Sequence, residues 1–206
     1  MIALVDYGMG NLLSVSKALE ASGGTIEITS DPSAIARADA LILPGVGNFG
    51  DGMEHLRTRG LAPEVVKFIE SGKPFLGICL GMQMLLEESE EAPGMKGLGV
   101  FKGKVKRFPD CGFKVPHMGW NNISILNKHH CLDGVADGSY FYFVHSFYAE
   151  PEDRSVVAAS SSYILDFCAA IGKDNVFATQ FHPEKSQNPG LRILRNFVAK
   201  FSEKGV

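Results

Sequence analysis

Short apolar runs recur through the first half of the chain, and helix-like segments separate them. The runs lie at residues 2–6, 25–29, 40–43 and 74–78. Helices are expected over 11–21, from an Asp31-Pro32 cap onward, and over 61–71 with Gly72 as the stop. A glycine-rich loop is expected over 44–52. This alternation predicts a parallel sheet with helices on both faces, and parallel sheets carry function at the carboxyl ends of their strands.

The second half of the chain has a different pattern. Strands with short connections are expected at 104–108, 119–125, 139–148 and 155–160, followed by a last apolar run at 176–181. Residues 188–201 then read as a closing amphipathic helix, with Leu191, Leu194, Phe197, Val198 and Phe201 at helical spacing. We therefore predict an α/β fold with a mostly parallel central sheet flanked by helices and an antiparallel extension. Its 206 residues are expected to form one domain, 1–206.

Composition narrows the classes of function. The formal net charge is −3 and no basic run occurs, which argues against nucleic acid as the main partner. No apolar run approaches membrane-spanning length, and the apolar start is too short for a secretory signal, so a cytoplasmic protein is expected. The four cysteines lack C-x-x-C spacing, and we expect neither a metal nor a cofactor. Cys111, Cys131 and Cys168 are interpreted as structural or incidental.

Cys79 lies where a predicted strand turns abruptly into a predicted helix over 80–88. Gly77 and Gly81 stand two residues to either side, and they remove the side chains that would clash in so tight a turn. A thiol at the start of a helix is favoured as thiolate, and the Leu80 N–H would point to a developing oxyanion. The alternative is that Cys79 is a small buried hydrophobe.

A second fragment, QFHPEKS, supplies the partners that a catalytic thiol needs. The run at 176–181 reads as a strand, and Pro183 keeps His182 out of helical geometry. In extended chain, residues two apart point the same way, so Glu184 can hold the ring of His182. The alternative is a surface loop with a solvated carboxylate. Taken together, Cys79, His182 and Glu184 are predicted to form a catalytic triad.

Four blocks resemble, in order, the signatures of the class I, triad-type glutamine amidotransferases. They are PGVG (44–47), GICLGMQ (77–83), HSF (145–147) and FHPEKS (181–186). Within that family, DYGMGNL (6–12), PHMGWN (116–121) and YFYFVHSFY (140–148) resemble the glutaminase subunits of imidazole glycerol phosphate synthase. The resemblance implies hydrolysis of L-glutamine. It also implies a heterodimer in which ammonia passes to a separate (β/α)₈-barrel synthase subunit that closes the imidazole ring in histidine biosynthesis.

The resemblance implies a role for each matching residue. Cys79 would attack the side-chain amide of glutamine to give a thioester, His182 would transfer protons, and Glu184 would orient the imidazole. The expected oxyanion donors are Leu80, Val46 and Gly47, and the expected substrate-binding residues are Gln83, Glu91, Ser146 and Phe147. Phe147 stands where tyrosine is typical, which is harmless if the contact is through backbone. Glu91 lies in an acidic run, for which the alternative is a solvated face.

A further set of residues is better explained as facing the partner synthase, because aromatic and amide groups suit interface cores. These residues are Asn11, Trp120, Tyr142 and Lys185. The alternative for Trp120 is a core aromatic. His55, His117, His129, His130 and His145 lack companion carboxylates at metal-ligand spacing, so surface or core roles are expected for them.

Three other functions remain open at the level of sequence. A cysteine hydrolase on a similar fold would keep the elbow cysteine but would not need PGVG, Gln83 and the H-P-E block together. A regulatory subunit without activity would be expected to lose a triad member. The closer rival is a sister glutaminase that supplies ammonia to a related synthase amidating a surface-sugar precursor. Departures at 23–28 and 163–170 from the typical pattern bear on the partner more than on the chemistry.

Overall fold

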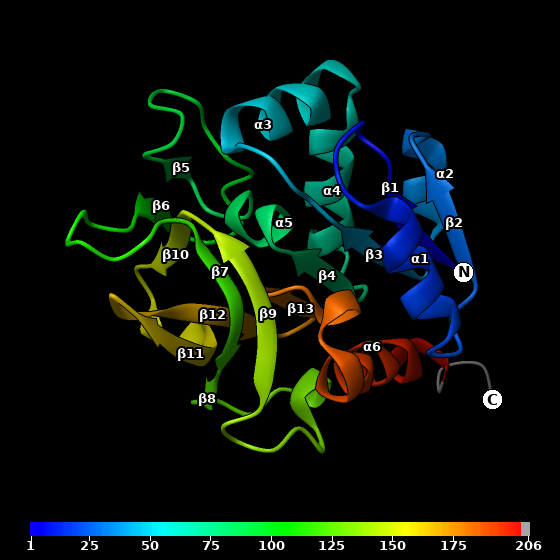
Figure 1. Ribbon diagram of the computed structural model, residues 1–206. Helices are drawn as coiled ribbons and strands as arrows, with labels where there is room; N and C mark the ends of the chain where they lie inside the picture. The colour runs from blue at the N-terminus through cyan, green and yellow to red at the C-terminus, as the bar shows by residue number, and fades with distance from the viewer. Residues whose placement is uncertain (203–206) are drawn as a thin grey trace.

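The computed structural model describes residues 1–202, and the side chains of Phe201 and Ser202 lie outside that description. Its centre is an eight-stranded sheet in the order β2-β1-β3-β4-β13-β12-β11-β8 (Figure 1). The parallel part consists of β2 (Ile26–Thr29), β1 (Ile2–Val5), β3 (Ala40–Leu43), β4 (Phe75–Ile78) and β13 (Val176–Thr179). The antiparallel part consists of β12 (Leu165–Lys173), β11 (Val157–Tyr163) and β8 (Ser124–Ile125). The predicted fold class is confirmed.

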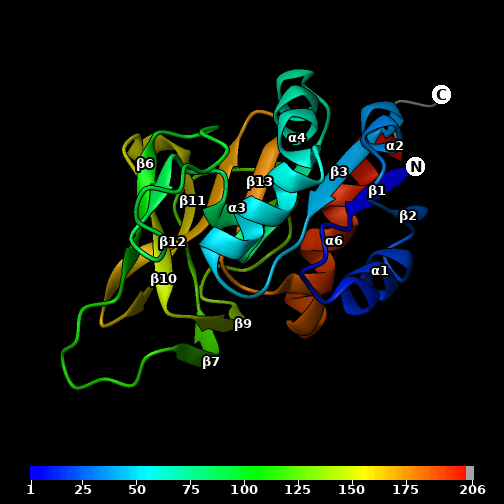
Figure 2. The same ribbon diagram turned by 90° about the horizontal axis from the view of Figure 1, so that it is seen from above.

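Helices cover both faces of the parallel part of the sheet (Figure 2). One face carries α2 (Pro32–Arg37), α3 (Phe49–Thr58) and α4 (Leu61–Glu70), and the other carries α1 (Leu12–Glu20) and α6 (Gln187–Ser202). Successive residues of β1 point to opposite faces, so Ala3 and Val5 belong to the first core and Ile2 and Leu4 to the second. None of the described helices combines the length and apolar character that a membrane span requires.

Two smaller sheets contain the rest of the predicted antiparallel extension together with β5 (Glu88–Ser89), which pairs parallel with β6 (Gly103–Arg107). One contains β10 (Phe147–Pro151), β6 and β5, and the other pairs β7 (His117–Asn122) with β9 (Tyr140–His145). The predicted strand at 139–148 is therefore two strands, which separate at Ser146 and enter different sheets. Three 3₁₀ turns complete the described elements: η1 (His130–Leu132), η2 (Arg154–Val156) and η3 (Pro183–Lys185).

The helix expected over 80–88 is wrong beyond its first turn. The α-helix α5 spans only Leu80–Gln83. Beyond it, the amide of Leu85 donates to Met82 O at 3.2 Å, which is a tighter three-residue turn. Residues 84–86 are fully buried, so the chain continues through the core toward β5 in place of an exposed amphipathic helix.

The two longest elements that escaped the sequence analysis are α3 and β12. The loop expected over 44–52 ends early, because Asn48 caps α3 by accepting from the amide of Asp51 at 2.8 Å. Glycine at 52 allows close packing of this helix, since a Cβ there would lie 3.0 Å from the sulfur of Met84 and 3.1 Å from Cδ2 of Leu80, closer than ordinary contact. The strand β12 has a buried centre that includes two adjacent alanines, Ala169 and Ala170, and alanine is depleted in strands.

Candidate active site

Cys79 stands in a strained turn between β4 and α5. Its backbone has φ 54° and ψ −106°, in the region that favours glycine. A Cβ at Gly81 would lie 1.9 Å from the carbonyl oxygen of Leu43, and a Cβ at Gly77 would lie 3.1 Å from Cβ of Ala178. Neither position tolerates a side chain without movement of its neighbours. The structure therefore forms the predicted elbow at the carboxyl end of β4, with the thiol 7% exposed.

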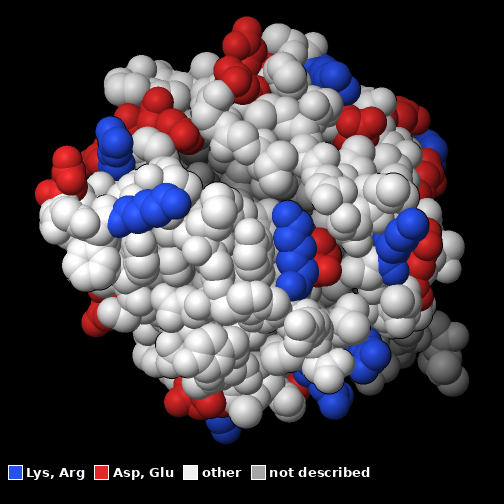
Figure 3. Space-filling view, viewed as in Figure 1, with Lys and Arg blue, Asp and Glu red and all other residues white. Residues whose placement is uncertain are grey.

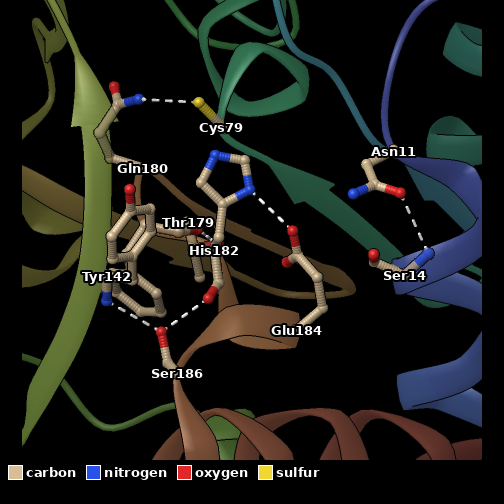
Figure 4. Close-up of polar contacts among 10 residues, drawn as sticks. Asn11, Ser14, Cys79, Tyr142, Thr179, Gln180, His182, Glu184 and Ser186 are labelled. Atoms are coloured by element: carbon tan, nitrogen blue, oxygen red, sulfur yellow. Dashed lines mark hydrogen bonds and ion pairs between the residues drawn. The ribbon is translucent and has the colours of Figure 1, made fainter. Parts of the chain in front are cut away.

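His182 and Glu184 follow β13, the neighbour of β4 in the sheet. Nδ1 of His182 lies 2.8 Å from Oε1 of Glu184, and the two side chains are 3% and 1% exposed. Nε2 of His182 is buried and has no hydrogen-bonding partner among the described residues. In Figure 4 the imidazole lies between the sulfur of Cys79 and the carboxylate of Glu184. The extended chain expected here holds for His182 only, because Glu184 lies in η3.

The electrostatics of His182 fit a proton carrier. Burial lowers the pKa of its imidazole, but the neighbouring Cys79 sulfur and the Glu184 carboxylate together outweigh burial and raise that pKa to about 10. A protonated imidazole beside the sulfur is the form that can give a proton to a leaving group.

One cavity of about 270 Å³ gathers nearly all the expected site residues. It is lined by the catalytic pair Cys79 and His182, the expected oxyanion positions Val46, Gly47 and Leu80, and the expected substrate positions Gln83, Glu91, Ser146 and Phe147. Glu184 does not line it and lies behind His182. The cavity is just below the roughly 300–1,000 Å³ typical of drug-sized ligands, which suits a substrate as small as an amino acid.

Two of the expected substrate residues are already engaged by the protein. Gln83 donates through Nε2 to Phe147 O and to Oε1 of Gln180, each at 3.0 Å, so its oxygen is the atom left for a ligand. Oε2 of Glu91 accepts from the amide of Phe49 at 2.8 Å, at the start of α3. Burial raises the pKa of Glu91 despite that hydrogen bond. Glu91 is therefore a half-buried part of the cavity wall.

Three of the four residues expected at an interface meet on one face. Trp120 on β7 is 47% exposed and contacts Tyr142 on β9 edge-on, with ring centroids 6.2 Å apart. Nζ of Lys185 lies 5.8 Å from the centroid of the Tyr142 ring. Asn11 is not among these contacts: it caps α1 by accepting from the amide of Ser14 at 3.2 Å. Trp120 is thus not a core aromatic, and Figure 3 shows few charged side chains over β7 and β9.

The histidines at 129 and 130 meet Cys131 at η1, with possible ligand atoms within 4.8 Å of one another. Burial raises the pKa of the Cys131 thiol, and it lowers that of His129 to about 4. The positive charge of Lys200 also acts on all three side chains. His129 stacks on Phe177 with ring centroids 4.8 Å apart. These contacts fit the surface or core roles expected from the sequence for His129 and His130.

Sequence reasoning missed Gln180. This side chain is fully buried on the strand side of the elbow, and its Nε2 lies 3.6 Å from Sγ of Cys79. The available signal was its place in the QFHPEKS block, two residues before His182.

Comparison with known proteins agrees with this geometry. The family model for glutamine amidotransferase class-I matches residues 3–201. The imidazole glycerol phosphate synthase subunit HisH of Syntrophotalea carbinolica is 53% identical, covering 96% of this chain and 98% of that protein. HisH of Acinetobacter baylyi is also 53% identical, with coverages of 96% and 97%. A crystal structure of a glutamine amidotransferase has the same fold, with a TM-score of 0.77 at 23% identity over 98% of this chain and all of that one. This chain therefore belongs to the class-I glutamine amidotransferases and, within them, to the HisH subunits of imidazole glycerol phosphate synthase.

Proposed function

We propose that this chain hydrolyses L-glutamine to glutamate and supplies the ammonia to the synthase that closes the imidazole ring in histidine biosynthesis. The observation that carries the proposal is the single cavity that joins Cys79, His182 and the expected oxyanion and substrate positions at the carboxyl ends of β4 and β13. Relatives of about half identity over nearly the whole chain are HisH subunits, which favours this role over the surface-sugar alternative.

The geometry supports a two-step reaction. The sulfur of Cys79 attacks the amide carbon of glutamine, and the carbonyl oxygen becomes an oxyanion. The amide of Leu80 and the peptide between Val46 and Gly47 are the donors proposed to meet that charge. His182 then protonates the leaving nitrogen, the C–N bond breaks, and ammonia departs from a γ-glutamyl thioester.

The second step consumes water. His182 takes a proton from a water molecule, and the hydroxide attacks the thioester carbon. The C–S bond breaks, glutamate leaves, and the sulfur returns to its starting state. Glu184 holds the imidazole through Nδ1 during both steps, so Nε2 stays directed at the sulfur side of the ring.

The rest of the substrate is placed by polar groups around the cavity. We assign the α-ammonium group of glutamine to the carboxylate of Glu91 and to the free oxygen of Gln83. The substrate carboxylate can only accept hydrogen bonds, so it is assigned to backbone N–H groups at Ser146 and Phe147, while the carbonyl of Phe147 accepts from Gln83 and His145. Such backbone contacts need no phenol, and phenylalanine at 147 therefore leaves them intact.

The partner is proposed to be a (β/α)₈-barrel synthase subunit, bound as a heterodimer over the face that carries Trp120, Tyr142 and Lys185. Asn11, at the start of α1, is assigned to the same interface. An exposed tryptophan that packs on a half-buried tyrosine is typical of the residues that dominate binding at interfaces. A cytoplasmic location stays a prediction.

The test uses the heterodimer with the imidazole-forming synthase subunit. Cys79→Ala is expected to abolish turnover with glutamine and to leave turnover with added ammonium salt intact. Cys111→Ala is the matched control, because that thiol is exposed and outside the cavity. Retained glutamine turnover in Cys79→Ala would show that the proposed nucleophile is wrong. Failure of the wild-type chain to support this synthase would instead favour the sister glutaminase.

A further inference from the structure

A chain of buried polar groups ends on the sulfur of Cys79. Nε2 of Gln180 is 3.6 Å from that sulfur, and Oε1 of Gln180 is 3.0 Å from Nε2 of Gln83. Gln180 is fully buried and is not among the residues that line the substrate cavity. It therefore contacts the reacting atom from the protein side, where glutamine does not reach (Figure 4).

The carboxamide of Gln180 can point only one way. Gln83 has a second contact through the same nitrogen, to the carbonyl of Phe147 at 3.0 Å, and a carbonyl can only accept. The nitrogen of Gln83 is thereby identified, and it must donate to an oxygen of Gln180. The other end of the Gln180 carboxamide, which faces the sulfur, is then the NH₂ group.

The same reasoning extends from Phe147 to the strand β7. Nδ1 of His145 lies 2.8 Å from Phe147 O, so this nitrogen carries the proton. Its Nε2 must accept from Nδ1 of His117 at 3.0 Å, and Nε2 of His117 accepts from Nδ2 of Asn121 at 3.3 Å. Burial lowers the pKa of His145 to about 3 and that of His117 to about 4, so both rings are neutral and keep these roles near pH 7.

We propose that Gln180 is a positioning residue for the glutaminase reaction, donating a side-chain N–H to the sulfur of Cys79 and holding the thiolate in line with the cavity. The hydrogen-bonded chain through Gln83 and Phe147 fixes the donor, and the histidine pair supports that chain from the β7–β9 sheet. The donor is uncharged, so it stabilises the negative sulfur without competing with His182 for the proton. This inference rests on the proposed role of Cys79 as nucleophile.

The experiment measures the thiol directly in the full chain. Iodoacetamide alkylation of Cys79 is followed by mass spectrometry of its peptide at pH 8, for wild type, Gln180→Met and Gln180→Glu. Gln180→Met keeps the length of the side chain and has no N–H donor, and Gln180→Glu keeps the shape and has no donor while its carboxylate is ionised. Asn175→Asp is the matched control. It makes the same carboxamide-to-carboxylate change at the opposite end of β13, where Nδ2 donates to the carbonyls of Ile69 and Lys73.

Alkylation of Cys79 is expected to slow about tenfold to a hundredfold in both Gln180 variants, the range for a hydrogen bond to a charged group. Asn175→Asp should stay within about twofold of wild type even if it unfolds at a lower temperature. In the complex, Gln180→Met should lower kcat by a larger factor than it raises KM, since glutamine does not touch this side chain and only its partner Gln83 lines the cavity. A folded Gln180→Met chain with wild-type alkylation and kcat would overturn the proposal. That result is distinct from failure of the proposed function, which appears as activity retained in Cys79→Ala.

Discussion

Replacement of Glu184 by glutamine isolates the effect of one buried charge on the catalytic imidazole. Glutamine has the same shape, and its oxygen can still accept from Nδ1 of His182, now 2.8 Å from Oε1. Its NH₂ group would occupy the place of Oε2, which has no hydrogen-bonding partner among the described residues. The change therefore removes the negative charge and keeps the contact that orients the ring.

The size of the effect follows from the burial of the pair. An opposite charge at this distance shifts a pKa by about 1–3 units, and each unit corresponds to about 1.4 kcal/mol. We expect the pKa of His182 to fall from about 10 by that amount in Glu184→Gln. The imidazolium that protonates the leaving nitrogen loses about 1.4–4 kcal/mol of stabilisation, which predicts a kcat roughly 10- to 1,000-fold lower.

The same charge has a consequence for stability. The pKa of His182 is raised from 6.5 to about 10 in the folded protein, so its contribution is complete below pH 6.5 and is lost as pH rises toward 10. Over that window the folded state binds more protons than the unfolded state, and the free energy of unfolding falls. In Glu184→Gln the decline should be smaller by about 1.4–4 kcal/mol, because the folded pKa lies closer to its unfolded value.

Two measurements check these expectations. Histidine NMR titration measures the pKa of His182, whose signal is identified by its absence from the spectrum of His182→Ala. Chemical denaturation gives the free energy of unfolding at pH 6.5, 8 and 10. Glutamate release by the complex gives kcat at saturating glutamine. If Glu184→Gln titrates like wild type and kcat changes less than about twofold, Glu184 does not set the charge of His182.

Three further outcomes are expected. A diazo-ketone analogue of glutamine should label Cys79 alone, since Cys131 and Cys168 are buried and Cys111 lies outside the cavity, and mass spectrometry showing another main adduct would contradict this. Gly81→Ala should lower the free energy of unfolding by at least about 1–3 kcal/mol, because the new Cβ would lie 1.9 Å from Leu43 O, and denaturation curves matching wild type would exclude the elbow geometry. The isolated chain should hydrolyse glutamine at least about a hundredfold slower than the liganded complex, because the peptide at Gly47 is expected to turn its N–H to the oxyanion only in that complex. Equal rates of glutamate release with and without the partner would contradict this reorientation of the peptide.

The features that could be predicted from the sequence depend on residues that are close together along the chain. The elbow at Cys79 required two glycines within two residues of it, and the cap of α2 required Asp31 followed by Pro32. The alternation of strands and helices indicated the parallel sheet, and the apolar runs that became β1, β3 and β4 are buried on both faces. The triad could be proposed because each of its two fragments carries its own local pattern.

The sequence by itself thus determined the fold class and the identity of the chemical groups, since periodicity, turn residues and local motifs act over a few positions. Tertiary structure alone decided which groups touch the sulfur and how they are oriented. Gln180 meets Cys79 across 101 positions of chain, and His117 meets His145 across 28. Strand order in the sheet and the close packing of buried amides bring these residues into contact, and no local sequence pattern predicts either contact.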